Sequence, residues 1–393
     1  MKFSSSSAFP GIDRASRSHT GARRALPLLL PIVLLVAACS SSAATGAPTA
    51  ASSSAAASSA AASPTAAASV AATPIAPASG SVLRLGYFPN VTHATAIVGV
   101  ESGLFQQALG SGVTLQTSTF NDGTSASQAL LSGAIDATYI GPNPAINAFQ
   151  KSNGSAVRVV SGATSGGAFL VVKQGINAAS DLKGKKVASP GLGNTQDISL
   201  RTWLLNNGLT TDTQGGGDVS IVPQGNAQTL QSFISGSIDG AWVPEPWATQ
   251  LIEKGNGHIL VKESDLWPQG QYATTVLLVR TDYLTAHPDV IKVLLQGELQ
   301  ADDLIASDPA KAQSLVTANI DRVTGTTLDP AVTAAAWKNL SFTDDPIASS
   351  FKTSADNAVK LGLLKTVDLT NLFDLSIING LLQDAGKPTV NGL

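Results

Sequence analysis

Short apolar runs alternate with longer amphipathic stretches along most of the chain beyond residue 80. The apolar runs have the length of buried strands, and the amphipathic stretches repeat their apolar positions with the period of a helix. This alternation predicts an α/β protein, in which helices flank mostly parallel sheets. Beyond residue 288 nearly the whole chain has the helical period.

The individual runs predict the order of the elements. The expected strands occupy residues 82–88, 113–120, 135–140, 156–163, 167–173, 181–191, 219–225, 238–244 and 271–284. The expected helices occupy residues 93–105, 124–133, 195–209, 226–236, 289–308 and 369–386.

One stretch occurs in two versions, QALLSGAIDATYIGPNPA from residue 128 and QSFISGSIDGAWVPEPWA from residue 231. In each version a helix ends near a glycine, Gly133 or Gly236, that suits a left-handed cap. A buried strand and a loop with two prolines follow. A general likeness of strand–helix–strand units is the alternative explanation, although it does not account for the matched prolines. Because open α/β sheets bind ligands at the carboxyl ends of their strands, the two loops predict a cleft between two lobes.

The first 39 residues predict an exported protein with a lipid anchor. Four arginines precede the apolar residues 25–38, which are too few for a comfortable membrane span and therefore indicate a secretory signal. The segment ends in LVAACS, which resembles a bacterial lipobox, so we expect lipidation of Cys39 after cleavage. The pair Arg23 and Arg24 leaves twin-arginine export open, but the rest of that pattern is missing and an ordinary route is expected.

Composition bounds the remaining chain. Residues 40–80 are almost entirely Ala, Ser, Thr and Pro, and such a segment buries too little apolar surface to order itself, so we expect a disordered tether. Cys39 is the only cysteine, which excludes disulfides, cysteine–zinc clusters and thiol catalysis. The formal net charge is −3 and no Lys/Arg-rich run occurs, so nucleic acid is not an expected partner. Residues 81–393 are too many for one simple core.

Four motifs in the same order resemble a known family. They are LRLGYFPNVTHATAIVGVESGLF, LLSGAIDATYIGPNPAINA, DLKGKKVASPGLGNTQDISLRTWL and FISGSIDGAWVPEPWA. Together they cover nearly all of residues 83–299 and are similar to the solute-binding proteins of ABC importers. The similar branch contains the alkanesulfonate, taurine and nitrate receptors and their thiamine-pyrimidine relatives.

The resemblance implies a two-lobed periplasmic-binding-protein type II fold with two crossings between the lobes. Lobe one would comprise residues 82–171 and 272–393, and lobe two residues 172–271. The lobes would close on a small molecule about a hinge, and the closed form would dock on an ABC permease in the membrane. The resemblance also implies an extracytoplasmic protein that uses no cofactor and performs no chemistry. We expect a monomer.

Two segments at predicted strand ends supply the first ligand contacts. Asn90, Thr92 and His93 lie between the first strand and the first helix. Thr92 also suits a helix N-cap, and a histidine here is often only a surface or capping residue. In the GPNP loop we expect contacts from Gly141 and Asn143, because the resemblance implies backbone N–H groups and a polar side chain there. A simple turn is the alternative.

The segment GLGNTQD, residues 191–197, is the strongest local candidate. Its glycines allow close approach, and the helix that follows presents free N–H groups and a positive dipole end to an anion. We expect a contact from Gly193, Asn194 or Thr195. Alternatively, Asn194 and Asp197 form a capping box. The segment is no dinucleotide fingerprint, because Gln196 stands where a glycine is needed.

The WVPEPWA segment adds Trp242 and Glu245 to the expected contacts. Trp242 and Trp247 also suit a core, whereas Glu245 lies between two prolines that would hold its side chain rigidly. Glu245 and Asp197 would disfavour a bare anion such as nitrate. Arg201, one or two turns into the helix, suits no more than a salt bridge to an acid there. They leave open a ligand with an amine or ring N–H groups, such as an aminopyrimidine.

Other classes of protein are weaker hypotheses. The chain lacks the G-x-S-x-G and H-E-x-x-H motifs, and the related pyrimidine-forming enzymes carry a cysteine-rich metal motif that is absent here. A sensor that presents its ligand to a membrane kinase fits the sequence as well as an importer component does. An adhesin would explain the tether but not the matched cleft loops.

Overall fold

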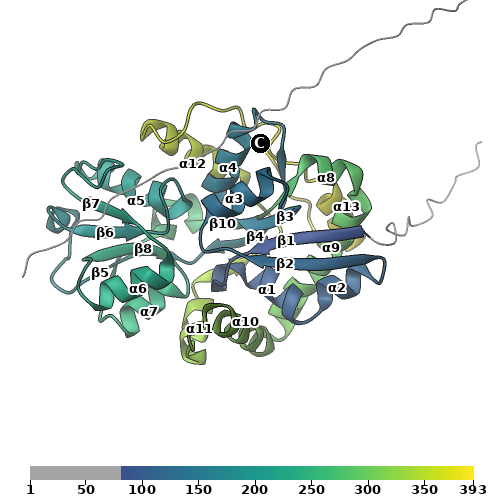
Figure 1. Ribbon diagram of the computed structural model, residues 1–393, viewed down its shortest axis with the longest axis horizontal. Coiled ribbons are helices and arrows are strands. Elements are labelled where there is room, and N and C mark those ends of the chain that lie inside the picture. Colours follow the sequence, from purple (N-terminus) through teal and green to yellow (C-terminus); the bar gives the residue numbers. More distant parts are fainter. Residues whose placement is uncertain (1–80) are drawn as a thin grey trace, which may run out of the picture. The chain divides into compact units, whose positions relative to one another are not determined.

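The computed structural model describes residues 81–393 (Figure 1). The expected leader, the lipidated Cys39 and the tether all lie outside the described residues. Within residues 81–393, none of the helices combines the length and the apolar character that a membrane crossing requires.

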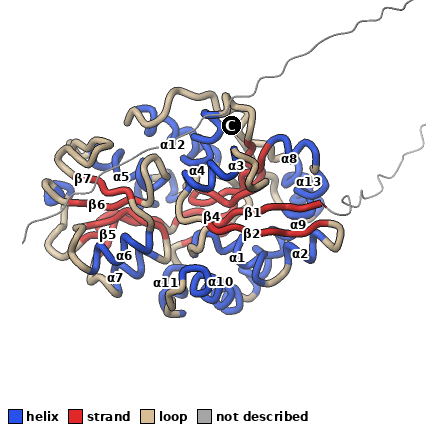
Figure 2. The backbone as a smooth tube through the Cα atoms, viewed as in Figure 1, coloured by secondary structure: helices blue, strands red, loops and turns tan. Residues whose placement is uncertain are grey.

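The strands form two separate sheets, drawn in red in Figure 2. The larger sheet has the order β11 (Leu340–Phe342), β4 (Val157–Gly166), β10 (Ala273–Arg280), β3 (Ala137–Ile140), β1 (Ser81–Tyr87) and β2 (Val113–Thr119). The smaller sheet has the order β7 (Ser220–Pro223), β6 (Lys186–Ser189), β8 (Gly240–Pro244), β5 (Ala168–Val172) and β9 (His258–Lys262).

Each sheet is mixed rather than mostly parallel. β1 pairs in parallel with β2 and β3, and β6 pairs in parallel with β7 and β8. In contrast, β10 runs antiparallel to β3 and β4, and β5 runs antiparallel to β8 and β9. The reason is that β5 and β10 begin at the crossings between the sheets and run away from them, whereas β3 and β8 run towards the cleft.

The first crossing between the lobes lies earlier than the sequence analysis expected. β4 ends at Gly166 in the larger sheet, and β5 begins at Ala168 in the smaller one, so residues 168–171 belong to lobe two rather than lobe one. Gly166 and Gly167 both have positive φ, +84° and +72°. A Cβ on Gly167 would lie 2.3 Å from the Leu340 side chain. The chain therefore changes sheets at a glycine pair that tolerates both the backbone conformation and the close packing.

Helices cover both faces of both sheets (Figure 1). One face of the larger sheet carries α1 (Ala94–Glu101), α2 (Leu104–Leu109), α8 (Thr281–Ala286), α9 (Pro288–Ser307), α10 (Pro309–Thr324), α11 (Pro330–Trp337) and α13 (Ser376–Asp384). The other face carries α3 (Gly123–Leu131), α4 (Pro142–Lys151) and α12 (Ala348–Lys360). The smaller sheet packs on α5 (Thr195–Asn206) on one face and on α6 (Asn226–Ile234) and α7 (Trp247–Glu253) on the other. The 3-10 turns are η1 (Val91–His93), η2 (Ala179–Leu182), η3 (Glu263–Leu266) and η4 (Pro268–Gly270).

The GPNP segment is the beginning of α4 and not a free loop. Gly141 is the N-cap, and Pro142 is the first helical residue. Proline suits this position, because the first N–H groups of a helix have no partner within the helix. The proline pair that suggested a turn therefore marks a helix start.

The repeated motif has the same structure in both lobes. Gly133 and Gly236 end α3 and α6 with φ values of +75° and +77°, as predicted. The aspartate that follows in each copy binds the strand that lies between two parallel partners: Asp136 accepts the backbone N–H of Arg84 in β1 at 2.9 Å, and Asp239 accepts that of Lys186 in β6 at 2.9 Å. The recurrence of this aspartate is thus explained by strand pairing.

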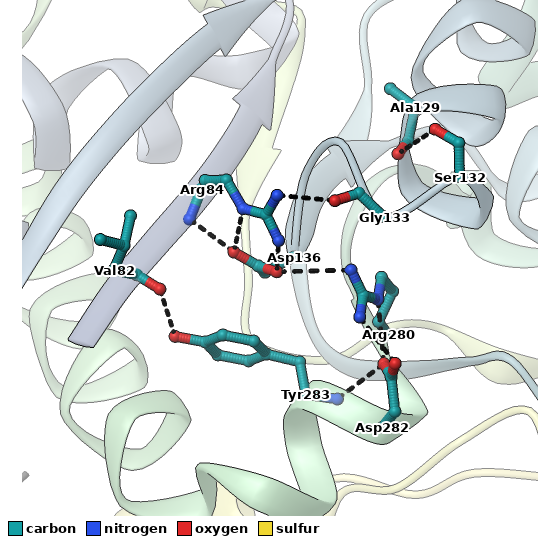
Figure 3. A network of polar contacts seen from close by, with 9 residues as sticks. All are labelled: Val82, Arg84, Ala129, Ser132, Gly133, Asp136, Arg280, Asp282 and Tyr283. Atoms are coloured by element: carbon teal, nitrogen blue, oxygen red, sulfur yellow. Dashed lines mark hydrogen bonds and ion pairs between the residues drawn. The ribbon is translucent and has the colours of Figure 1, made fainter. Parts of the chain in front are cut away.

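The first copy adds charge pairing to this arrangement (Figure 3). The Arg84 guanidinium donates to both carboxylate oxygens of Asp136 and to the Gly133 carbonyl. Arg280 lies 3.5 Å from the same carboxylate and pairs also with Asp282. The network joins β1 and β10 to the end of α3, at the end of the sheet away from the cleft.

Candidate functional site

A small cavity of about 40 Å³ lies where the strands of both sheets end. We call it the interlobe cavity. Its lining residues are Phe88, Asn90, Thr92, His93, Asn121, Asp122, Gly123, Gly141, Pro144, Pro190, Asn194, Thr195, Gln196, Asn226, Pro244 and Thr274. Six of the expected contact residues are among them: Asn90, Thr92, His93, Gly141, Asn194 and Thr195.

The N-terminal ends of several helices converge on the interlobe cavity. α3, α4, α5 and α6 begin at Gly123, Pro142, Thr195 and Asn226, and η1 leads into α1 beside them. The first turn of a helix carries unpaired N–H groups and a partial positive charge. Among the described residues that line the cavity there is no lysine or arginine. The one charged residue among these described lining residues is Asp122, which caps α3, so any attraction of the cavity for an anion must come from these helix N-termini.

His93 is a neutral hydrogen-bond donor in this cavity. The imidazole stacks on Phe88 at 4.5 Å between ring centroids, and its Nδ1 accepts the Phe88 backbone N–H at 3.4 Å. Burial disfavours the charged ring and lowers the pKa of His93 to about 3. Because Nδ1 is the acceptor, the single ring proton lies on Nε2.

Asn194 is buried without a partner. Its side chain is 3% exposed, and neither Oδ1 nor Nδ2 has a hydrogen bond in the described part of the chain. The side chain does not cap α5, so the alternative of a capping box is wrong. Glycines make room for it, since a Cβ on Gly191 would lie 2.3 Å from Nδ2 and one on Gly123 2.8 Å from Oδ1. A buried amide group without a hydrogen-bond partner lowers the stability of the fold by about 1–3 kcal/mol per group. A ligand that forms the missing hydrogen bond recovers that free energy when it binds.

Asn226 is a cavity residue that sequence reasoning missed. It begins α6, is 7% exposed, and its Oδ1 is buried without a partner. The internal repeat could have identified Asn226 from the sequence. Asn226 begins α6 just as Gly123, another cavity residue, begins α3, and each follows a short strand and a loop. Asn121, Asp122 and Thr274 were missed as well.

Trp242 and Glu245 do not line the interlobe cavity. Trp242 and Val243 are neighbours on β8 and point to opposite faces; Trp242 packs on the α5 side and donates Nε1–H to Glu263 at 2.6 Å. Glu245 is 1% exposed and accepts from the Thr249 N–H and hydroxyl, so it holds the start of α7. The expected ligand contacts from these two residues therefore find no support in the lining of the interlobe cavity.

Asn143 and Gly193 also fall outside the lining. The Asn143 side chain turns towards α12 and donates to the Ser354 carbonyl at 3.2 Å. Gly193 has φ +75° and donates its N–H to Asp197 at 2.9 Å. Asn143 helps to join helices, and Gly193 shapes the turn that presents Asn194.

Asp197 is no obstacle to an anion. It accepts from Arg201 Nε at 2.9 Å, from the Ser189 hydroxyl at 2.7 Å and from the Gly193 N–H. The buried pair with Arg201 compensates its charge. The objection that acids in this region disfavour a bare anion therefore does not hold for Asp197.

Hydrogen bonds join the lobes around the cavity. Trp247 Nε1–H donates to Asn90 Oδ1 at 2.7 Å, and Asn339 Nδ2 donates to Glu245 at 2.8 Å. The Asn143 backbone N–H donates to Thr195 Oγ1 at 3.4 Å. The lobes are therefore in contact on more than one side of the cavity.

A comparison with protein families matches residues 76–320 to the NMT1-like family. The taurine-binding periplasmic protein of Escherichia coli (strain K12) is 29% identical over 199 residues, which are 51% of this chain and 60% of that protein. The periplasmic nitrate-binding protein of Synechocystis PCC 6803 superposes with a TM-score of 0.65 at 16% identity, covering 80% of this chain and 91% of that one. The alkanesulfonate-binding protein of Xanthomonas axonopodis pv. citri, bound to MOPS, superposes with a TM-score of 0.61 at 21% identity, covering 74% and 96%. These likenesses confirm the two-lobed binding-protein fold and the family expected from the sequence motifs.

Proposed function

Because the chain belongs to the NMT1-like family, we propose that it is an extracytoplasmic solute-binding protein of an ABC importer. It captures a small sulfonate-like or nitrate-like oxyanion in the interlobe cavity and delivers it to a membrane permease. The names of its relatives support this cargo class, and the family and the fold point to a binding protein rather than an enzyme.

The observation that carries the proposal is that the protein itself occupies acceptor atoms around the cavity. The Nδ1 of His93, the Oδ1 of Asn90 and the Oγ1 of Thr195 each accept a hydrogen bond from the protein. Each group keeps a donor for a ligand: an imidazole N–H, an amide NH₂ and a hydroxyl, while the Asn90 and Thr195 oxygens retain one further lone pair. An oxyanion accepts hydrogen bonds on every oxygen and therefore matches this set.

Asn194 and Asn226 favour a ligand with a second, donating group. Each has a buried side-chain oxygen without a partner in the described structure. An oxyanion that also carries an amine, as taurine does, would satisfy both kinds of group. An aminopyrimidine is the alternative, since its amine and ring nitrogens both donate and accept.

We expect oxyanion affinity to stay constant between pH 5.5 and 8. Burial holds the pKa of His93 at about 3, so the imidazole is neutral throughout this range and binding takes up no proton. Isothermal titration calorimetry in buffers of different ionisation enthalpy measures both affinity and proton uptake. An affinity that rises about tenfold for each unit of falling pH would mean that a protonated His93 is the anion's partner.

Affinity, rather than melting temperature, is the correct readout for this experiment. The unfolded chain binds a proton on this histidine near pH 6.5, whereas the folded chain does not. The unfolded state therefore holds more protons between pH 3 and 6.5, and stability contributed by neutral His93 is lost as the pH falls through that window. Melting temperatures would fall with pH even if ligand affinity did not change.

The proposal extends to a lipid anchor on Cys39, which holds a monomer at the outer face of the cell membrane. Replacing Cys39 by alanine removes the only thiol in the chain and should release the protein from membranes into the soluble fraction. Fractionation and metabolic labelling with a fatty acid check this outcome. Equal membrane association of both forms, with no label on the unmodified chain, would contradict it.

A further inference from the structure

A tryptophan of one lobe contacts a cavity residue of the other. Asn90 follows β1 of the larger sheet, and Trp247 begins α7 beside the smaller one. Both side chains are buried, and the Trp247 Nε1–H lies 2.7 Å from Asn90 Oδ1. This bond joins the lobes at the edge of the interlobe cavity, which Asn90 lines.

The bond fixes which end of the Asn90 amide points where. An indole nitrogen can only donate, so the atom of Asn90 that meets it must be the oxygen. The NH₂ group then lies on the opposite side of the amide, away from Trp247. Turning the amide over would set two donors, the indole N–H and the amide NH₂, against each other between two buried side chains.

We propose that Trp247 is a positioning residue: on closure, its indole orients the Asn90 amide so that NH₂ faces the ligand. This inference rests on the proposed function, because it concerns how the same cavity selects an acceptor-rich ligand. In an open cleft the Asn90 amide is free to present either end. Closure therefore fixes the Asn90 amide in the orientation in which its NH₂ group donates to the ligand.

The setting of Trp247 suits such a role. Its ring is 7% exposed and packs with Phe233 and Leu251 in the core of lobe two. On its other side it borders a small cavity together with Ile320 and Leu328 of lobe one. Packing in this core restricts the ring and the direction of its N–H, and a rigid donor orients a flexible amide more effectively than the reverse.

A double-mutant cycle separates positioning from simple packing. The variants are Trp247→Phe, Asn90→Ala and the pair, titrated by calorimetry with nitrate, methanesulfonate and taurine. Phenylalanine keeps an aromatic ring but is smaller than the indole and lacks its N–H, so Trp247→Phe should weaken the best-bound probe about fivefold to tenfold. In the Asn90→Ala background the same substitution should change affinity less than twofold, because the group on which it acts is gone.

If the fold-losses in affinity of the two single variants multiply in the double variant, Trp247 acts on closure or packing and not through Asn90. That result would overturn the inference while the proposed function stands. If the unsubstituted protein binds none of the three probes, the proposed function fails and this inference fails with it.

A second measurement covers the case that Trp247→Phe does not fold. The indole ¹H–¹⁵N signal of Trp247 is followed during titration with the best-bound probe. Closure should move it downfield in the unsubstituted protein, and Asn90→Ala should abolish that movement. A signal that does not move, or that moves equally in Asn90→Ala, would contradict the assignment.

Discussion

Replacing Asn194 by aspartate is expected to reduce oxyanion affinity on the order of a thousandfold. The new carboxylate would lie in the interlobe cavity, where Asn194 is 3% exposed and has no cationic neighbour among the described lining residues. Two like charges about 4 Å apart at an effective dielectric constant of about 20 repel each other by roughly 4 kcal/mol. Calorimetric titration at pH 8 with the best-bound anion measures the loss.

Alanine at the same position is the matched control. Asn194→Ala, alone or with Thr195→Ala, removes one or two hydrogen bonds without adding charge and should weaken binding by roughly tenfold. Asn194→Ala should not lower folding stability, because the Oδ1 and Nδ2 of Asn194 have no partner to lose in the described structure. Whether Asn194→Asp weakens or strengthens binding indicates the class of ligand. If this variant binds an amine or aminopyrimidine more strongly than the unsubstituted protein does, the cargo is the alternative ligand and not an oxyanion. Unchanged binding in both variants would remove Asn194 from the site.

Replacing Gly141 by alanine is expected to weaken ligand binding by tenfold or more while the protein stays folded. The backbone at Gly141 has φ −75° and ψ 160°, which alanine adopts without strain. Its Cβ, however, would lie 2.6 Å from Thr195 Oγ1, which belongs to the other lobe. The methyl group therefore obstructs the approach of α4 to α5 that closes the cavity.

Gly225→Ala provides the control for this variant. Gly225 is the N-cap of α6 as Gly141 is of α4, its φ is −59°, and a Cβ there would meet nothing within 4 Å. Binding by Gly225→Ala should match that of the unsubstituted protein. Equal losses in the two variants would show that a cap glycine matters for helix stability and not for closure, and melting curves of both would support that reading.

The location of the site was predictable from the order of the elements. Asn90, His93, Gly141 and Asn194 were selected because each follows a predicted strand, and the carboxyl ends of parallel strands meet in one place. The structure brings all four to the interlobe cavity. For these residues no knowledge of side-chain direction was needed, since the chain position alone decides where they lie.

Side-chain direction was the part that the sequence could not supply. All five residues of β8 are buried, so its pattern does not reveal that Trp242 points to the α5 side. Glu245 was selected for its rigid setting, but one of its partners is Asn339, which lies 94 residues further along the chain. The crossing at Gly166 and Gly167 was missed because the lobe boundary was taken from the family resemblance and not from the glycine pair between the two predicted strands. In each case a distant contact decides the outcome.

The measurement that tests the central claim most directly is a thermal-shift titration of the purified protein. The panel contains nitrate, bicarbonate, taurine, methanesulfonate, riboflavin and an aminopyrimidine. A ligand at about 100 times its dissociation constant adds roughly 2.7 kcal/mol to the free energy of unfolding, enough to raise the melting temperature by a few degrees. The donors of His93, Asn90 and Thr195 and the helix N-termini at the cavity predict that an oxyanion produces this rise. A rise with the aminopyrimidine alone, or with none of the oxyanions, would contradict the account.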